Sequence, residues 1–242
     1  MKLALVGGTG TLNLFKVGEE RSLETGYGEA SAPAVRVGIG ALDAWYLARH
    51  GRPHRIPPHR INYRANIDGL KQLGVEGIVA INAVGGVDPA LPCGGLVIPD
   101  QLIDYTWGRV HSFSDEADSP LRHVEFAQPF GGRLRTALLA AADAADLGVI
   151  DAGCVAVTQG PRLETAAEIR RLQRDGCTVV GMTSMPEAAL AREAGMDYAS
   201  LCVVANPAAG LDPEPISMED IERVLAGAMD DAVRLLACLG KP

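Results

Sequence analysis

The sequence lacks the features that would direct the protein to a membrane or to a polyanion. No run of apolar residues is long enough to span a bilayer, and residues 1–6 lead straight into glycines without the basic start and long apolar segment of a secretion signal. Acidic residues outnumber basic ones by 30 to 22, so the surface has no general attraction for nucleic acid. We therefore expect a cytoplasmic protein that binds neither membranes nor nucleic acid, and in which any phosphate is captured locally.

Closely spaced cysteine pairs are also lacking. The five cysteines lie scattered among apolar or small residues, without the spacing of a metal clip. Reduced thiols fit this pattern, and we expect neither a metal site nor a bound cofactor. The cysteines are Cys93, Cys154, Cys177, Cys202 and Cys238.

Short apolar runs alternate with amphipathic segments along the whole chain, a pattern typical of strands interleaved with helices. Several of the apolar runs are apolar on both faces, as central strands covered by helices are. With 242 residues, 48% of them hydrophobic, and no linker or repeat, residues 1–242 are expected to form a single α/β domain around a central, largely buried sheet flanked by helices. Strands are expected at 2–6, 34–38, 44–48, 77–83, 95–98, 153–158, 178–182 and 199–204, and helices at 62–73, 132–147, 165–173, 186–194 and 218–239.

A glycine-rich loop, GGTGT at residues 7–11, follows the first predicted strand. Its glycines allow backbone N–H groups to face an anion without steric obstruction. The loop lacks the third glycine of a dinucleotide-binding fingerprint and the length and lysine of a P-loop, which disfavours NAD and ATP as ligands. A tight turn without a ligand remains an alternative.

Three further strand ends carry groups that suit an anion. Arg49 and His50 follow one strand, and an arginine there can grip a phosphate through two parallel hydrogen bonds, although most arginines are solvated surface charges. Asn82 and Ala83 close the most apolar strand, next to glycines that let a ligand approach the main chain. Thr183 precedes a helix and can either bind an anion or simply cap that helix. Because open α/β sheets collect ligands at the carboxyl ends of their strands, we expect these groups to share one crevice.

Two polar side chains suit hydrogen bonding to a flat ring. Glu164 precedes a predicted helix and can either help to cap it or face a ligand. Asn206 ends another apolar strand and can donate to one atom while accepting from another. Residues 104–130 have no clear periodicity, which indicates a loop that is functional or disordered.

Taken in order, these segments resemble the signature blocks of the trimeric purine nucleoside phosphorylase and methylthioadenosine phosphorylase family. The resemblance runs from the loop at residue 7 to about residue 225, which is nearly the whole chain. It implies the family's α/β fold with a mixed sheet, a homotrimer or a dimer of trimers, and the cleavage of a small purine nucleoside with inorganic phosphate as co-substrate. The most specific blocks are LARHG at 47–51, NYRAN at 62–66, NAVGG at 82–86, GPRLET at 160–165 and MTSMPE at 182–187.

The same resemblance implies roles for individual residues at the phosphate and sugar. Met182 stands at the place of the family's ribose-stacking methionine and, with Thr183, is expected to bind the ribose, although a core methionine is the alternative. In the implied mechanism Arg49 and its neighbours hold phosphate beneath the anomeric carbon, where it attacks a cationic ribosyl centre. The phosphate site is expected to comprise Thr9, Arg49, His50, Asn82, Ala83 and Thr183.

Base choice depends on Asn206, Glu164 and residue 208. Family members that act on 6-aminopurines have an aspartate where this chain has Ala208, whereas 6-oxopurine members have an asparagine and a glutamate, matched here by Asn206 and Glu164. Asn206 would stabilise charge arriving at N7 and O6 of the departing base, and ionised Glu164 would accept the N1–H of a 6-oxopurine. Adenine would face Glu164 with a lone pair, a mismatch that costs ~1–3 kcal/mol. Ala83 and Leu163 complete the expected base pocket.

At the sugar's 5′ end the resemblance points to the methylthio subfamily. Met218 stands where 6-oxopurine members place a histidine, and its thioether, extended by Ile221, suits a methylthio group better than a hydroxyl. His54 matches a histidine of the methylthioadenosine enzymes and is expected to close this pocket from a neighbouring subunit, unless its role is structural. Phe113 and Phe126 are also candidates to cross between subunits.

The combined features predict a 6-oxopurine 5′-methylthionucleoside as substrate. Three alternatives stay open: a methylthioadenosine phosphorylase, a general 6-oxopurine nucleoside phosphorylase, and a sensor or binding module that uses the same crevice without turnover.

Overall fold

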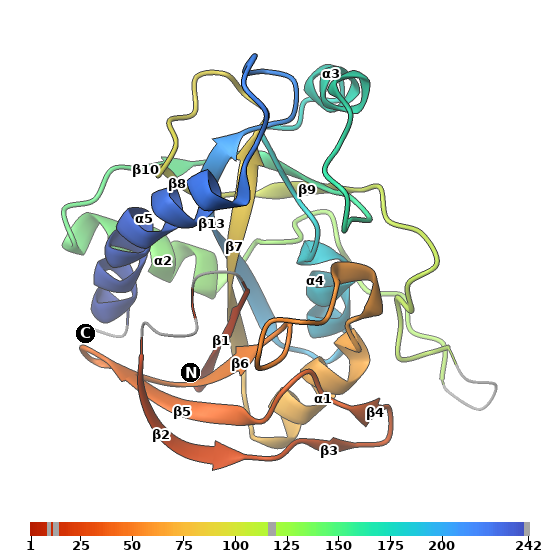
Figure 1. Ribbon diagram of the computed structural model, residues 1–242. Coiled ribbons are helices and arrows are strands. Elements are labelled where there is room, and N and C mark those ends of the chain that lie inside the picture. The colour runs from red at the N-terminus through yellow and green to blue at the C-terminus, as the bar shows by residue number, and fades with distance from the viewer. Residues whose placement is uncertain (9–10, 12–14, 116–119, 240–242) are drawn as a thin grey trace.

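The computed structural model describes residues 1–242 except 9–10, 12–14, 116–119 and 240–242 (Figure 1). Within the described residues, eleven strands form one mixed sheet, a two-stranded ribbon lies beside it, and five α-helices and a short 3-10 helix complete the fold. The strands are β1 (Leu3–Gly7), β2 (Lys16–Arg21), β3 (Glu24–Thr25), β4 (Gly28–Glu29), β5 (Ala34–Ile39), β6 (Leu42–Ala48), β7 (Gly77–Gly86), β8 (Leu96–Ile98), β9 (Gln101–Asp104), β10 (Val149–Asp151), β11 (Cys154–Val157), β12 (Val179–Gly181) and β13 (Asp197–Pro207). The helices are η1 (Pro58–Arg60), α1 (Tyr63–Gln72), α2 (Arg133–Ala144), α3 (Ala166–Arg174), α4 (Ser184–Glu193) and α5 (Met218–Cys238).

Strands β7 and β13 form the centre of the sheet. They run parallel and pair along nearly their whole length, and both are buried at almost every position, as apolar strands covered on two faces must be. Each is longer than the sequence predicted: β7 continues through Gly86 and β13 through Pro207, because each gives the other a hydrogen-bonding partner beyond its apolar core. The predicted strand ends at residues 83 and 204 were therefore too early.

The sheet divides along the other edge of β7. There β1 pairs with β7 from Gly77 to Ile81, while β12 pairs with Gly85 and Gly86. Between these two partners, residues 82–84 of β7 have no strand beside this edge in the described part of the chain. One branch continues from β1 through β6 and β5 to β2, and the other from β12 through β11 to β9. The division leaves part of β7 open on one side.

Helices cover both faces of the central strands (Figure 1). Helices α2 and α5 pack against each other and against β13, whereas α4 packs on β13 beside α1. Helix α5 begins with a side-chain cap, since the Ser217 hydroxyl accepts the Asp220 N–H at 3.0 Å. Helix α3 covers a separate small apolar cluster that includes Ile169 and Leu172. The apolar faces are thus buried, and the ends of β7 and β13 remain available to a site.

All eight predicted strands and five predicted helices are present, with ends shifted by a few residues, and the expected mixed sheet is confirmed. The prediction missed β2, β9 and β10, which are short or at an edge, and the ribbon of β3 and β4. Strand β2 reads KVGEER, too polar to resemble a buried strand.

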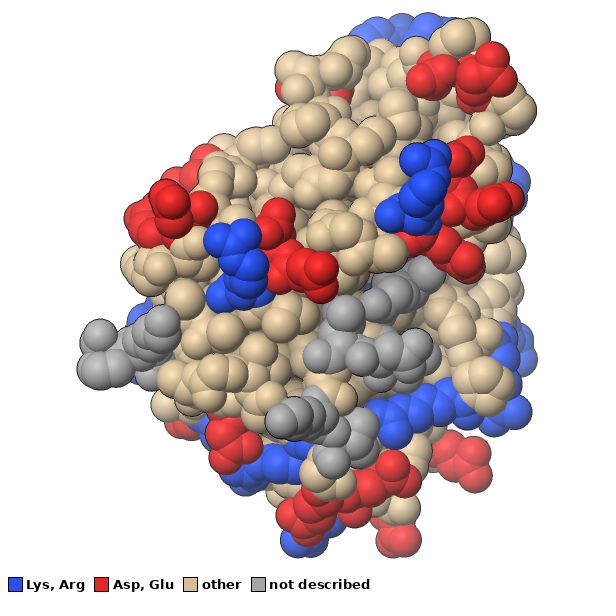
Figure 2. Space-filling model, turned by 60° about the vertical axis from the view of Figure 1, so that its left-hand side comes forward, with Lys and Arg blue, Asp and Glu red and all other residues tan. Residues whose placement is uncertain are grey.

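Charges are dispersed over the surface. On the face shown in Figure 2, acidic and basic side chains are interspersed and separated by broad uncharged areas. None of the helices in the described ranges is both long and apolar enough to cross a membrane.

Candidate functional site

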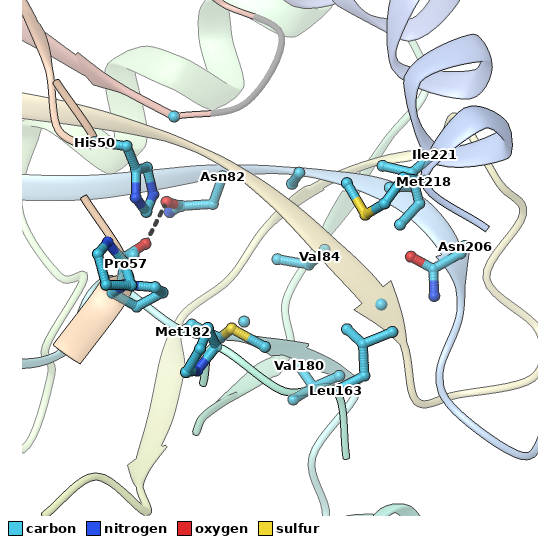
Figure 3. A pocket seen from close by; sticks show the side chains of 18 of the residues that line it. His50, Pro57, Asn82, Val84, Leu163, Val180, Met182, Asn206, Met218 and Ile221 are labelled. Carbon is cyan, nitrogen blue, oxygen red and sulfur yellow. Dashed lines mark hydrogen bonds between the residues drawn. The ribbon is translucent and has the colours of Figure 1, made fainter. Parts of the chain in front are cut away.

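A cavity of about 450 Å³ lies where the sheet divides (Figure 3). Its walls come from β7, the end of β13, the segments that follow β6, β11 and β12, and the start of α5. Every predicted site residue that the structure describes lines this one cavity, although those residues come from six separate parts of the chain; Thr9 lies outside the described residues. The lining residues in question are Arg49, His50, His54, Asn82, Ala83, Leu163, Glu164, Met182, Thr183, Asn206, Ala208, Met218 and Ile221.

Arg49 is buried and held by Glu187. The guanidinium is 1% exposed and donates from Nε and Nη2 to the two carboxylate oxygens of Glu187 at 2.8 and 2.7 Å. Burial by itself lowers the pKa of Arg49, but the Glu187 carboxylate outweighs it and raises that pKa, so the group stays charged. The two parallel hydrogen bonds that the sequence suggested for phosphate are therefore made to Glu187 instead.

The remaining guanidinium contacts leave one direction open to a ligand. Nη1 donates to Asn82 Oδ1 at 2.9 Å, and Nη2 donates to the Val6 carbonyl at 3.2 Å. A further contact joins Nη1 to the Ile81 carbonyl, but at 3.5 Å it is long for a hydrogen bond. Nη1 is thus the nitrogen from which Arg49 can donate to an anion in the cavity.

Asn82 and Thr183 join the same network. Asn82 Oδ1 also accepts from the Thr183 hydroxyl at 3.2 Å, and its Nδ2 donates to the Ser200 hydroxyl at 2.8 Å. Thr183 precedes α4 but makes no side-chain capping bond. The simple helix-cap interpretation of Thr183 is therefore wrong, and its hydroxyl lies on the cavity wall beside Asn82.

His50 is neutral in this setting. Its Nδ1 lies 2.7 Å from the Ile56 carbonyl, and since a carbonyl can only accept, the proton sits on Nδ1. Burial, and then the positive charge of Arg49, lowers the pKa of His50 to about 4. His54 stacks on this ring, with ring centroids 4.3 Å apart.

The depressed pKa of His50 predicts a pH dependence of stability. Because His50 takes up a proton near pH 6.5 when unfolded but only near pH 4 when folded, its stabilising contribution is complete above pH 6.5 and is lost as the pH falls toward 4. The expected loss is about 3 kcal/mol of unfolding free energy, since one pKa unit is worth about 1.4 kcal/mol. Denaturant titrations from pH 4 to 8 should show this slope in the wild type and a smaller one in His50→Gln; equal slopes would contradict the assignment.

Main-chain groups complete this end of the cavity. Residues 82–84 present the unpaired edge of β7, so backbone hydrogen-bonding groups there need partners from a ligand or water. Gly8 approaches closely, since a Cβ there would meet the His50 ring at 3.3 Å and Arg49 Nη1 at 3.7 Å. The space here therefore suits a small oxyanion, because it is surrounded by the open edge of β7, the Arg49 guanidinium and the Thr183 hydroxyl.

Glu164 lies at the other end of the cavity, away from Arg49 and Thr183. Helix α3 is capped by a capping box formed by Thr165 and Glu168, so the cap interpretation of Glu164 is wrong. Its Oε1 accepts the Thr158 hydroxyl at 2.6 Å. The carboxylate is thus fixed by one oxygen, and the other is available to a ring N–H.

Asn206 owes its place to a β-bulge. The pairing of β13 with β7 shifts between Val204 and Asn206, which makes Ala205 the extra residue and changes the direction of the side chain that follows. Asn206 Nδ2 donates to the carbonyl of Pro207 at 2.6 Å. Ala208 is buried next to it and carries no carboxylate that could accept from an exocyclic amine.

The three residues predicted for the 5′ pocket do not lie together. Met218 and Ile221, at the start of α5, are near Asn206 in Figure 3, on the side of the cavity opposite His50. His54 stacks on His50 and lines the cavity of its own chain. The turn after β6 brings it there, and its expected entry into the pocket of a neighbouring subunit stays a prediction.

The predicted crossing residues also pack within their own chain. Phe113 and Phe126 are partly buried against the core, and Phe113 contacts the Tyr27 ring with centroids 5.1 Å apart. Met218 is 61% exposed, so this end of the cavity is open to solvent in a single chain. The homotrimer, or dimer of trimers, stays a prediction.

Sequence reasoning missed three buried polar residues that support the site. Glu187 is fully buried on α4, and Tyr198 on β13 donates to its Oε1 at 2.9 Å. Arg109, from the aperiodic stretch, is 8% exposed and donates to the carbonyls of Met182 at 2.9 Å and of Gln159 at 2.9 Å. The one available signal was Glu187 itself, an acidic residue within the apolar segment MPEAALA. Arg109 had no signal, because most of its acceptors are backbone carbonyls.

Comparisons with known proteins agree with this geometry. A protein of Xylella fastidiosa named "Probable S-methyl-5'-thioinosine phosphorylase" is 51% identical over 240 residues, which cover 97% of this chain and 96% of that protein. The 6-oxopurine nucleoside phosphorylase of Pyrococcus furiosus is 41% identical, with 97% of this chain and 90% of that protein covered. The crystal structure of methylthioadenosine phosphorylase from Schistosoma mansoni in complex with adenine superposes with a TM-score of 0.92 at 30% identity, covering 99% of this chain and 91% of that one.

These relatives are similar to the chain over nearly its full length, and residues 2–239 match a single family. The fold, the cavity at the division of the sheet and the residues around it are all contained in that match. The chain belongs to the phosphorylase superfamily.

Proposed function

We propose that the protein cleaves S-methyl-5′-thioinosine with inorganic phosphate, giving hypoxanthine and 5-methylthioribose 1-phosphate. The observation that carries this proposal is the pairing of Glu164 and Asn206 beside Ala208 in the same cavity as Met218 and the anion-binding groups. An acceptor and an amide with no second carboxylate suit a 6-oxopurine, and the thioether of Met218 suits an apolar 5′ tail. The name of the Xylella fastidiosa relative supports the same substrate.

The arrangement suggests how the reaction proceeds. Phosphate would bind among Arg49 Nη1, the Thr183 hydroxyl and the open edge of β7, and the purine would lie near Asn206 and Glu164. Met182 and Val84 lie between these two ends in Figure 3, where the ribose would fit.

As the glycosidic bond breaks, phosphate would stabilise the cationic ribosyl centre and then attack it with inversion. Asn206 would donate to the purine as negative charge develops there, and Glu164 would hold the ring in place. No protein nucleophile and no bound cofactor are required for this sequence of steps.

Methylthioadenosine is the second candidate substrate. The similarity to the Schistosoma mansoni enzyme, together with Met218, favours it. Ala208 and Glu164 oppose it, because the 6-amino group would lack an acceptor and N1 would meet a carboxylate. Inosine is a third candidate, given the Pyrococcus furiosus relative, but Met218 offers no hydrogen bond to a 5′-hydroxyl.

A comparison of kcat/KM for methylthioinosine, methylthioadenosine and inosine tests the proposal. We expect methylthioinosine to be the best substrate and hypoxanthine to appear only when phosphate is supplied. Higher kcat/KM for methylthioadenosine would contradict the assigned base pocket. Binding without hypoxanthine release would instead identify a sensor or binding module.

Replacing Ala208 with aspartate should shift base preference toward the 6-amino purine. The new carboxylate would accept from the exocyclic amine and face the O6 oxygen of hypoxanthine with like polarity. A change of ~1–3 kcal/mol for such a pair corresponds to roughly 5- to 150-fold in the ratio of kcat/KM for methylthioadenosine and methylthioinosine. Ala144→Asp, at an exposed position of α2 that does not line the cavity, is the control and should not produce that shift.

A further inference from the structure

We propose that Glu187 is a positioning residue for phosphorolysis: it fixes Arg49 and cancels its charge, so that phosphate lies in a buried cradle with no net charge of its own. The cradle is defined here as Arg49, His50, Asn82, Thr183 and the open edge of β7 at residues 82–84. This inference rests on the proposed function, because it concerns how the phosphate co-substrate is used.

The contact between Glu187 and Arg49 fixes the guanidinium plane. Both side chains are 1% exposed, and two parallel hydrogen bonds of 2.7 and 2.8 Å join them. Tyr198 donates to the same carboxylate at 2.9 Å, and Asn82 and the Val6 carbonyl accept from the guanidinium. With these partners on three sides, Arg49 has little freedom to turn, and Nη1 points toward Asn82 at the cavity wall.

The same contact removes the net charge. One buried cation and one buried anion cancel, and the remaining cradle groups are an amide, a hydroxyl and backbone. His50 adds no charge at neutral pH, because burial and the neighbouring Arg49 charge lower its pKa to about 4.

Other charged groups near the cavity lie outside the cradle. Arg55 lines the cavity but is exposed, so that solvent screens its charge. Arg109 donates to the carbonyl of Met182 and does not line the cavity, and Glu164 lies at the base end of the cavity.

A neutral cradle favours catalysis over tight phosphate binding. A site with excess positive charge would stabilise the phosphate dianion in the ground state and would also repel the developing ribosyl cation. Only interactions that are stronger in the transition state than in the ground state accelerate the reaction. In a neutral cradle the dianion keeps its charge, and that charge can stabilise the cation as the glycosidic bond breaks.

Glu187→Gln tests this proposal, with Glu187→Asp and Leu138→Ala for comparison. Glutamine keeps the shape of Glu187 but leaves the charge of Arg49 uncancelled, whereas aspartate keeps the charge and shortens the side chain. Leu138 is fully buried on α2 and does not line the cavity, so Leu138→Ala reports what a loss of stability does by itself. Wild-type phosphorolysis of methylthioinosine is measured first; its absence would refute the proposed function rather than this inference.

For Glu187→Gln we expect kcat to fall about tenfold or more while the phosphate KM falls about threefold or more, because the added charge stabilises bound dianion and opposes the ribosyl cation. Phosphate should also raise the Tm of this variant more than that of the wild type. Leu138→Ala should lower Tm without moving the phosphate KM. An unchanged or higher phosphate KM in Glu187→Gln, or an unchanged kcat, would overturn the proposal.

Glu187→Asp keeps the proposal testable even when the glutamine variant does not fold. It should lower kcat, because Arg49 is no longer held at the same place, and leave the phosphate KM within about twofold of wild type, because the charge is kept. A severalfold change in the phosphate KM of this variant would show that charge cancellation is not what Glu187 contributes.

Discussion

Replacing Asn206 with alanine should lower kcat for methylthioinosine by roughly 10²–10³-fold, the usual cost of removing a donor aimed at developing negative charge. The amide is the group in the cavity that can donate to N7 or O6 while the purine departs. The β-bulge at Ala205 gives the side chain its direction, so no neighbour can replace it. Steady-state kinetics with saturating phosphate measures the effect.

The phosphate KM serves as the internal control for Asn206→Ala. Asn206 lies at the opposite end of the cavity from His50 in Figure 3, so we expect the phosphate KM to stay within about twofold of wild type while kcat falls. Asn206→Asp, which keeps the shape but loses the donor, should be at least as slow. Turnover equal to wild type in the alanine variant would refute the role given to Asn206.

Replacing Arg49 with methionine should destabilise the protein and abolish most activity. Glu187 would be left as an uncompensated charge in a fully buried position, which typically costs about 3–5 kcal/mol of unfolding free energy. Phosphate would also lose its charged donor, and we expect kcat/KM for phosphate to fall at least about a hundredfold. Denaturant unfolding and steady-state kinetics measure the two effects separately.

A double variant separates the structural loss from the catalytic one. In Arg49→Met with Glu187→Leu both charges are removed together, and a buried ion pair replaced by apolar residues of similar volume is often neutral in stability. We expect the double variant to recover most of the unfolding free energy and none of the activity. A double variant with near-wild-type phosphorolysis would show that Arg49 does not act on phosphate.

The positions of the strand-end residues could be predicted because each follows an apolar run. Ala83 ends one predicted strand and Thr183 follows another, and hydrophobicity alone identifies both strands. Thr183 reaches Asn82 for a reason that the sequence did not show: β12 runs antiparallel to β7, so the chain after Gly181 returns along the open edge of β7. The predicted site residues that the structure describes therefore line one cavity. Their roles in binding and catalysis stay predictions until the variants are measured.

The partners of those residues could not be predicted in the same way. Arg49 and Glu187 are 138 positions apart, and the fork that joins them depends on how α4 packs against β13. Arg109 comes from a stretch without periodicity and binds mainly backbone carbonyl oxygens, which every residue has. The bulge at Ala205 arises from the register between two strands, and a register is a property of the pair.

Because the sheet divides along β7, bound substrates should connect two parts of the sheet mechanically as well as react chemically. The branch of the sheet that ends in β2 and the branch that ends in β9 both pair with β7, and in the described part of the chain the two branches do not pair with each other across residues 82–84. A nucleoside and phosphate lying in that gap would bridge the two branches. Occupancy should therefore slow amide hydrogen exchange in β1 and in β12 together, even though these two described strands do not pair with each other.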